Sequence, residues 1–107
     1  MIDVIIKRNQ EKISQITISG HAGSAKHGSD LICAAVSASG VGVLNSLAQY
    51  GFLDQNMGKL EMQEGYINIE VIESNEKIFM ILETLITILT TIAMDNKKYI
   101  KITKVEV

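Results

Sequence analysis

The residue types best suited to nucleophilic chemistry gather in one short part of the chain, because the single cysteine and both histidines lie between residues 21 and 33. A cysteine is a nucleophile in its thiolate form, and a neighbouring imidazole can take the thiol proton. Cys33 falls in the first turn of a predicted helix, where unpaired N–H groups and the positive end of the helix dipole stabilise an anion. His21 directly follows a predicted strand, from which its imidazole can fold back toward that helix. We therefore predict that Cys33 is a nucleophile and that His21 is its proton acceptor.

Asp30 and Ser37 are close to Cys33 in the sequence and are predicted to support it. Asp30 is interpreted first as the cap of the helix, with Ser29 as the alternative cap, and second as a carboxylate that orients the histidine. Ser37 follows Cys33 by four residues, which places its hydroxyl one turn later on the same side of the helix. Taken singly, each chemical residue has a simpler interpretation, since lone cysteines are usually buried and loop histidines are usually solvated.

The segment between the strand and the helix is small, polar and rich in glycine, with the sequence GHAGSAKHGSD from residue 20 to residue 30. Gly20, Gly23 and Gly28 permit close approach of a peptide backbone and opening of a lid. Since no large apolar side chain anchors residues 21–29, we predict a loop that is mobile when free and closes over a bound peptide. His27 is predicted to have no direct chemical role.

A metal site is a further interpretation of the same residues. The candidate ligands follow one another at spacings of six, three and three residues, and they are His21, His27, Asp30 and Cys33. These spacings match no repeated pair of tight ligands. We predict neither a metal nor another cofactor, and a zinc site remains an alternative that metal analysis of the purified protein tests.

The composition is that of an ordinary globular protein. A chain of 107 residues is long enough for one hydrophobic core, and we predict a single domain over residues 1–107. The formal net charge of -2 and the lack of a basic patch argue against direct nucleic acid binding. One cysteine cannot form an intramolecular disulfide, and the first residues do not resemble a secretory signal, so we predict a cytoplasmic location. The apolar run from Ile78 to Met94 contains Glu83 and four threonines, which favours a buried helix over a membrane span.

Hydrophobic periodicity predicts five strands and two helices in the order ββαββαβ. The predicted elements are strands near 2–6 and 16–18, a helix from 30 to about 50, strands at 60–62 and 66–72, a helix from 75 to about 94, and a strand at 99–105. A polar turn near residues 9–12 and a two-residue turn at Glu64 and Gly65 are predicted to join the two pairs of strands as hairpins. Two helices are too few for a doubly wound parallel sheet, so we predict the α+β class, with both helices packed on a mainly antiparallel sheet. Gly40 and Gly42 inside the first helix predict that another backbone packs close to it.

The second predicted helix carries apolar residues along two stripes. One stripe consists of Ile78, Leu82, Leu85, Leu89 and Ile92, and the other consists of Phe79, Ile86 and Ala93. Because apolar residues lie on more than one face of this helix, one face needs a second partner, and we predict a two-fold homodimer that buries part of this helix.

Three short motifs resemble the signature of a known family. Residues 20–22 read GHA, one residue separates Gly28 from Asp30, and residues 32–37 read ICAAVS. In this order and spacing they resemble the bacterial ribosomal-processing cysteine protease family, Prp. The resemblance implies an endopeptidase that removes the N-terminal extension of a large-subunit ribosomal protein precursor during ribosome maturation.

The resemblance also implies roles for individual residues. It places the catalytic dyad on His21 and Cys33. It places the supporting aspartate on Asp30 and the helix hydroxyl on Ser37, and it implies a homodimer. Backbone N–H groups at the start of the first helix are the expected donors to the oxyanion of the reaction. The alternative function is a non-catalytic ribosome assembly factor, in which residues 20–30 are a contact loop and the cysteine belongs to the core.

Overall fold

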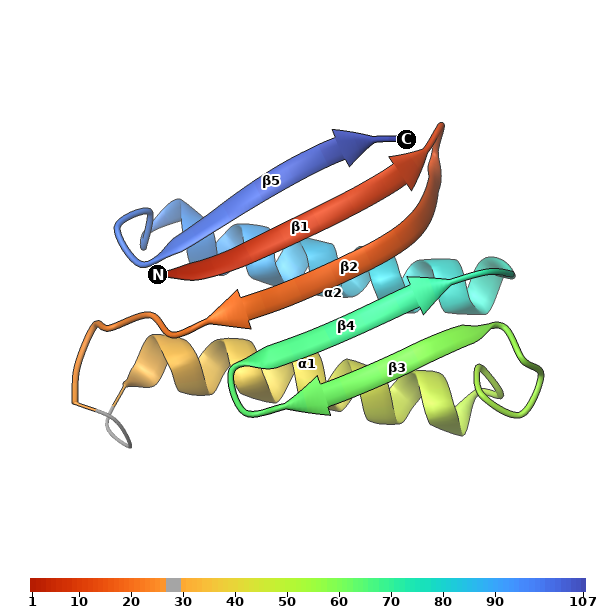
Figure 1. Cartoon of the computed structure of the whole chain (residues 1–107), viewed down its shortest axis with the longest axis horizontal. Coiled ribbons are helices and arrows are strands. Elements are labelled where there is room, and N and C mark those ends of the chain that lie inside the picture. Colours follow the sequence, from red (N-terminus) through yellow and green to blue (C-terminus); the bar gives the residue numbers. More distant parts are fainter. Residues whose placement is uncertain (27–29) are drawn as a thin grey trace.

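The chain forms two β-hairpins, each followed by a helix, and returns to the sheet as a fifth strand (Figure 1). The computed structural model describes residues 1–26 and 30–107. The elements are β1 (Ile2–Asn9), β2 (Lys12–Gly20), α1 (Leu31–Gln49), β3 (Gly58–Gln63), β4 (Tyr66–Val71), α2 (Glu76–Met94) and β5 (Ile100–Glu106). The predicted order ββαββαβ is therefore confirmed.

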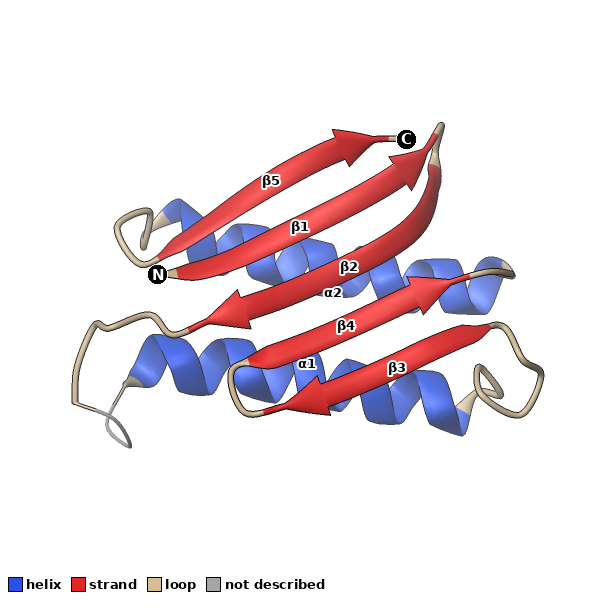
Figure 2. Ribbon diagram, in the orientation of Figure 1, coloured by secondary structure: helices blue, strands red, loops and turns tan. Residues whose placement is uncertain are grey.

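The strands form one sheet in the order β3-β4-β2-β1-β5. Every neighbouring pair is antiparallel except β1 and β5, which run parallel. Figure 2 shows both helices on the same face of this sheet. The predicted α+β class, with two helices packed on a mainly antiparallel sheet, is confirmed. Because β4 pairs with β2 and aligns Tyr66 with Ser19, the turn between β3 and β4 lies beside the end of β2.

The core fills the space between the sheet and the two helices. On β1, Ile2, Val4 and Ile6 are at most 2% exposed, and they alternate with outward-facing residues. Burying a side chain of this size stabilises the fold by about 1.5 to 3 kcal/mol. The helices complete the core with Leu47 of α1 and Leu85 of α2, both at 0% exposure. The ends of β2 and α1 that carry the candidate residues are thus fixed to one packed unit.

Close packing between α1 and the sheet depends on one glycine. A methyl group added at Gly40 would lie 2.6 Å from Cδ1 of Ile67 on β4, whereas one added at Gly42 would meet nothing within 4 Å. The prediction that another backbone packs close to both glycines is therefore wrong. The neighbour of Gly40 is a side chain, and Gly42 faces open space.

The second apolar stripe of α2 packs within the fold, whereas the sequence analysis expected one apolar face of this helix to need a partner. Ile86 is buried, and Phe79 and Ala93 pack against the core while partly exposed. The fold therefore uses this stripe itself, and the argument that it needs a partner does not hold. The apolar residues that α2 leaves exposed lie on its outer face and are Met80, Ile88 and Met94.

Both helices pass a simple test for membrane spans among the described residues. Each has 19 residues and a mean hydropathy of 1.8 over its most apolar window. In the fold, however, both pack side by side against one sheet and contribute to its core. Their apolar composition is explained by this packing, as the sequence analysis predicted for residues 78–94.

Candidate active site

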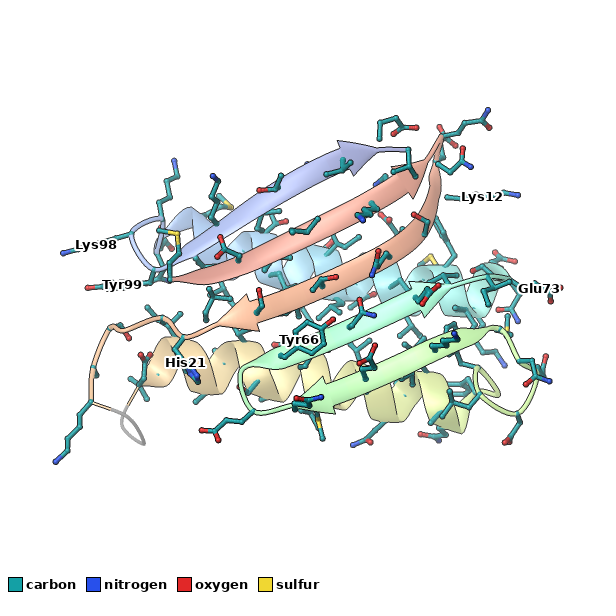
Figure 3. The ribbon with its side chains drawn as sticks, in the orientation of Figure 1. Lys12, His21, Tyr66, Glu73, Lys98 and Tyr99 are labelled. Atoms are coloured by element: carbon teal, nitrogen blue, oxygen red, sulfur yellow. The ribbon has the colours of Figure 1, made fainter. Side chains whose placement is uncertain are left out.

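The end of β2, the start of α1 and the turn between β3 and β4 surround one cavity of about 790 Å³. Figure 3 shows His21 just beyond the end of β2 and Tyr66 at the beginning of β4. Every predicted site residue that the structure describes lines this cavity, namely Gly20, His21, Gly23, Asp30, Cys33 and Ser37. Gly28 and His27 lie outside the described residues. The sequence prediction missed the contribution of the β3–β4 hairpin, whose residues 62–66 form the opposite wall.

Asp30 caps α1, as predicted. Its Oδ1 accepts the N–H groups of Ile32 at 3.1 Å and Cys33 at 3.0 Å. Its Oδ2 accepts the N–H of Ser24 at 2.9 Å, and the Ser24 hydroxyl donates to Oδ1. These hydrogen bonds hold the pKa of Asp30 well below its ordinary value of 3.8, and the bond from the Ser24 hydroxyl has the largest effect, followed by the bond from the Cys33 N–H. Asp30 is therefore an anion that joins the loop to the first turn of the helix.

The sulfur of Cys33 also has a backbone partner. The N–H of Ala22 donates to Cys33 Sγ at 3.1 Å, and Cys33 itself is half-buried. An N–H directed at a sulfur stabilises negative charge there, in addition to the effect of the helix dipole. The residue that supplies this donor was not singled out from the sequence. Ala22 has no reactive side chain, and only its position beside β2 gives it this role.

His21 lies against the turn between β3 and β4. A methyl group added at Gly65 would lie 2.9 Å from His21 Nε2, so the imidazole packs on the bare Cα of this glycine. The same turn holds the end of β2, because Gly20 N–H donates to the Gly65 carbonyl at 2.9 Å. Gly65 has a φ of +70°, a conformation that glycine adopts without strain. The sequence indicated a turn at this position but not its contact with the histidine.

Ser37 lies one turn after Cys33 on the wall of the cavity and is exposed. At the other end of the site, Gly20 has a φ of +96°, and a side chain there would collide with the carbonyl of Met1. Gly23 has a φ of +68° with open space around it. Both φ values lie in the left-handed region, which glycine adopts without strain.

The expected oxyanion donors at the start of α1 are already in use. Ile32 and Cys33 donate their N–H groups to the Asp30 side chain, and Ala34 donates to the Asp30 carbonyl at 3.0 Å. The N–H groups of these three residues are therefore not free to bind the oxyanion. The strong N-cap that orders the helix occupies the donors that the sequence argument had left free.

The first part of the loop, residues 21–24, is held by several contacts, whereas the sequence analysis predicted a loop without anchors. Ala22 is 5% exposed and bonded to Cys33, and Ser24 is bonded twice to Asp30. The sequence argument considered only large apolar anchors, whereas these are a methyl group, two backbone N–H groups and a hydroxyl. Residues 27–29, on which the predicted lid also depends, lie outside the described residues.

The described residues offer no cluster for a metal ion. Within 1–26 and 30–107, no three His, Cys, Asp or Glu side chains are grouped so that they could hold one. What the cavity does hold is a thiol at a helix start, a backbone donor on its sulfur and an imidazole. This set is suited to covalent attack on a carbonyl group.

Comparison with known proteins agrees with this chemistry. The family model described as cysteine protease Prp matches residues 1–101. The chain belongs to the Prp family. Its members are cysteine peptidases, so the resemblance noted in the sequence is confirmed.

Individual Prp relatives match along nearly the whole chain. The ribosomal processing cysteine protease Prp of Bacillus subtilis (strain 168) is 33% identical over 110 residues, covering 96% of each protein. The crystal structure of the essential ribosomal processing protease Prp from S. aureus with a covalently linked product peptide has a TM-score of 0.81 at 25% identity. The match covers 97% of this chain and 99% of that one. SMU.848 from Streptococcus mutans has a TM-score of 0.81 at 26% identity, with 100% and 96% covered.

Proposed function

We propose that this chain is a cytoplasmic cysteine endopeptidase that removes the N-terminal extension of a large-subunit ribosomal protein precursor. All of residues 1–107 act as one protease domain. The observation that carries the proposal is the placement of the Cys33 sulfur at the start of α1, with a backbone donor, in a cavity that His21 also lines. Family membership and a relative bound covalently to a product peptide support a peptide substrate.

In the proposed mechanism, His21 takes the proton of Cys33. The thiolate forms a bond to the scissile carbonyl carbon, and the carbonyl electron pair moves to oxygen. When that pair returns, the C–N bond breaks and the protonated imidazole gives its proton to the departing amine. A water molecule, deprotonated by His21, then releases the acyl group by the same steps and restores the thiol. None of these reaction steps requires a metal or a cofactor.

The supporting residues act on the geometry of this dyad. Asp30 holds the first turn of α1 and the loop together through its bonds to Cys33 and Ser24. Ser37 presents its hydroxyl to the cavity one turn away. Among the described glycines of the loop, Gly23 has open space around it and so leaves room for a peptide backbone to approach.

The cavity has the dimensions and lining that a peptide requires. Its volume of about 790 Å³ is within the range of sites that enclose a drug-sized ligand. Ile18, Val36 and Ile67 supply apolar surface at its base, and Met62 is 57% exposed at its rim. The hairpin and α1 thus form two walls between which an extended segment can lie.

Thiol alkylation against pH tests the dyad without any knowledge of the substrate. In the wild-type chain, iodoacetamide should alkylate Cys33 faster at neutral pH than it alkylates an ordinary cysteine, because His21 accepts the proton. The variant His21→Ala should lose this advantage, whereas the control His27→Ala should keep it. A non-catalytic assembly factor predicts the slow alkylation of an ordinary core cysteine in all three proteins.

A further inference from the structure

The proposed reaction requires a hydrogen-bond donor that Ile32, Cys33 and Ala34 of α1 do not supply. When the thiolate attacks, the substrate oxygen becomes negative, and donors placed in advance at that oxygen lower the barrier. Ile32, Cys33 and Ala34 donate to Asp30 instead. These three N–H groups are therefore not available to that oxygen.

The N–H of Ala22 is in the right place. It lies 3.1 Å from Cys33 Sγ, so it points at the atom that forms the new bond. In the tetrahedral intermediate, the oxyanion is one bond beyond the carbon that the sulfur attacks. A donor beside the sulfur can therefore contact that oxygen when the carbonyl is oriented toward the donor. After attack the sulfur carries no charge and is a weak acceptor, whereas the oxygen is a strong one.

The surrounding contacts hold this N–H rigidly. The Ala22 side chain is 5% exposed, which fixes the peptide unit between His21 and Ala22. On one side, Gly20 N–H donates to the Gly65 carbonyl at 2.9 Å, and on the other, Ser24 N–H donates to Asp30 at 2.9 Å. A donor that needs no reorganisation during the reaction is the kind that contributes most to catalysis. Because this peptide unit also carries His21, the base and the donor are positioned together.

We infer that the backbone N–H of Ala22 is a catalytic group that stabilises the Cys33 thiolate once His21 has taken the thiol proton, and that it transfers to the substrate oxyanion during attack. This inference rests on the proposed function. The electron pair of the sulfur forms the S–C bond, the carbonyl pair moves to oxygen, and the Ala22 N–H exchanges its sulfur acceptor for that oxygen. Collapse of the intermediate returns the pair to the C=O bond, breaks the C–N bond and releases the amine with the proton from His21. The Ala22 N–H donates to the sulfur again after water has released the acyl group.

Replacing one amide by an ester tests the inference. L-Lactic acid in place of Ala22 keeps the methyl group and removes only the N–H. The control carries L-lactic acid in place of Ala38, which lies inside α1 and loses one helical hydrogen bond. We expect the change at position 22 to lower kcat about 100-fold relative to the control, with little change in KM. A kcat within about threefold of the control overturns the inference.

A second measurement keeps the inference testable if the ester variant does not fold. A substrate-derived peptide aldehyde adds to Cys33 and places an oxygen where the oxyanion forms, whereas the corresponding peptide alcohol does not add. The Ala22 amide proton should move downfield with the aldehyde and not with the alcohol. An unchanged amide shift with the bound aldehyde overturns the inference, whereas a wild-type chain that cleaves no precursor overturns the proposed function itself.

Discussion

At the scale of single residues, the candidate site combines reactive side chains with groups of the backbone. Cys33, His21 and Asp30 have distinctive chemistry, and all three line the same cavity. The Ala22 N–H and the Cα of Gly65 have no side-chain signal. Their contacts arise only after β2 pairs with β4, which joins residues far apart in the sequence.

The acid stability of the fold should depend on Asp30. Its pKa is lowered in the folded chain, so the carboxylate stabilises the fold above its ordinary pKa of 3.8. That contribution is lost as the pH falls below this value toward the folded pKa. We expect Asp30→Asn to lower the thermal midpoint at neutral pH and to flatten its decline between about pH 4 and pH 2. An equal decline of the thermal midpoint with falling pH in the variant and the wild type would contradict this role of Asp30.

Ser24 should contribute to the same effect. Its hydroxyl is the largest cause of the low pKa of Asp30, so Ser24→Ala should raise that pKa. The carboxylate should then stabilise the fold less at neutral pH, and its contribution should be fully lost at a higher pH than in the wild type. The control is Ser39→Ala, which removes a hydroxyl bond to the Ala35 carbonyl on α1, away from the carboxylate. Carbon NMR of the Asp30 carboxyl measures the pKa directly. Equal titration curves for the two serine variants would contradict the role of Ser24.

At the scale of elements, the hairpins and helices follow from local pattern, whereas their pairing does not. The alternation of branched residues and the glycine at position 65 were sufficient to predict both hairpins. β5 pairs with β1 in parallel after α2 has carried the chain back along the sheet, and no local pattern reveals this pairing. For the same reason the fit of Gly40 against Ile67 was misjudged, since it depends on where α1 crosses the sheet.

The β3–β4 turn should control the position of His21. In the variant Gly65→Asn, asparagine can adopt the positive φ, but its Cβ would collide with the His21 imidazole. We therefore expect a loss of at least about 10-fold in kcat/KM, while unfolding stays cooperative. The control is Gly51→Asn, at a φ of +90°, whose new Cβ would meet the movable end of Gln55. The pH dependence of alkylation should change only in the first variant. Equal activity in the two variants would show that the turn does not position the histidine.

At the scale of the whole molecule, the outer face of α2 supports the proposed two-fold homodimer. Met80 is 59% exposed, Ile88 is 37% exposed and Met94 is 66% exposed, although all are apolar. The threonines between them on this face carry no charge. We expect the wild type to sediment as a dimer. The variant Ile88→Lys should sediment closer to a monomer, because it places a charge in the buried interface. The control Leu53→Lys changes a residue that is 46% exposed outside the helices. A monomeric wild-type protein, or equal effects of both changes, would contradict this interface.

The central claim is that Cys33 cuts the extension from the ribosomal protein precursor, and mass measurement of that precursor tests it directly. Wild-type protein and Cys33→Ala are each mixed with the extended precursor, and the product masses are recorded over time. We expect the wild type to remove the extension and Cys33→Ala to leave it intact while unfolding cooperatively, because loss of one sulfur removes little packing volume. An intact precursor after incubation with the wild type, or cleavage by Cys33→Ala at a near-normal rate, would contradict the account.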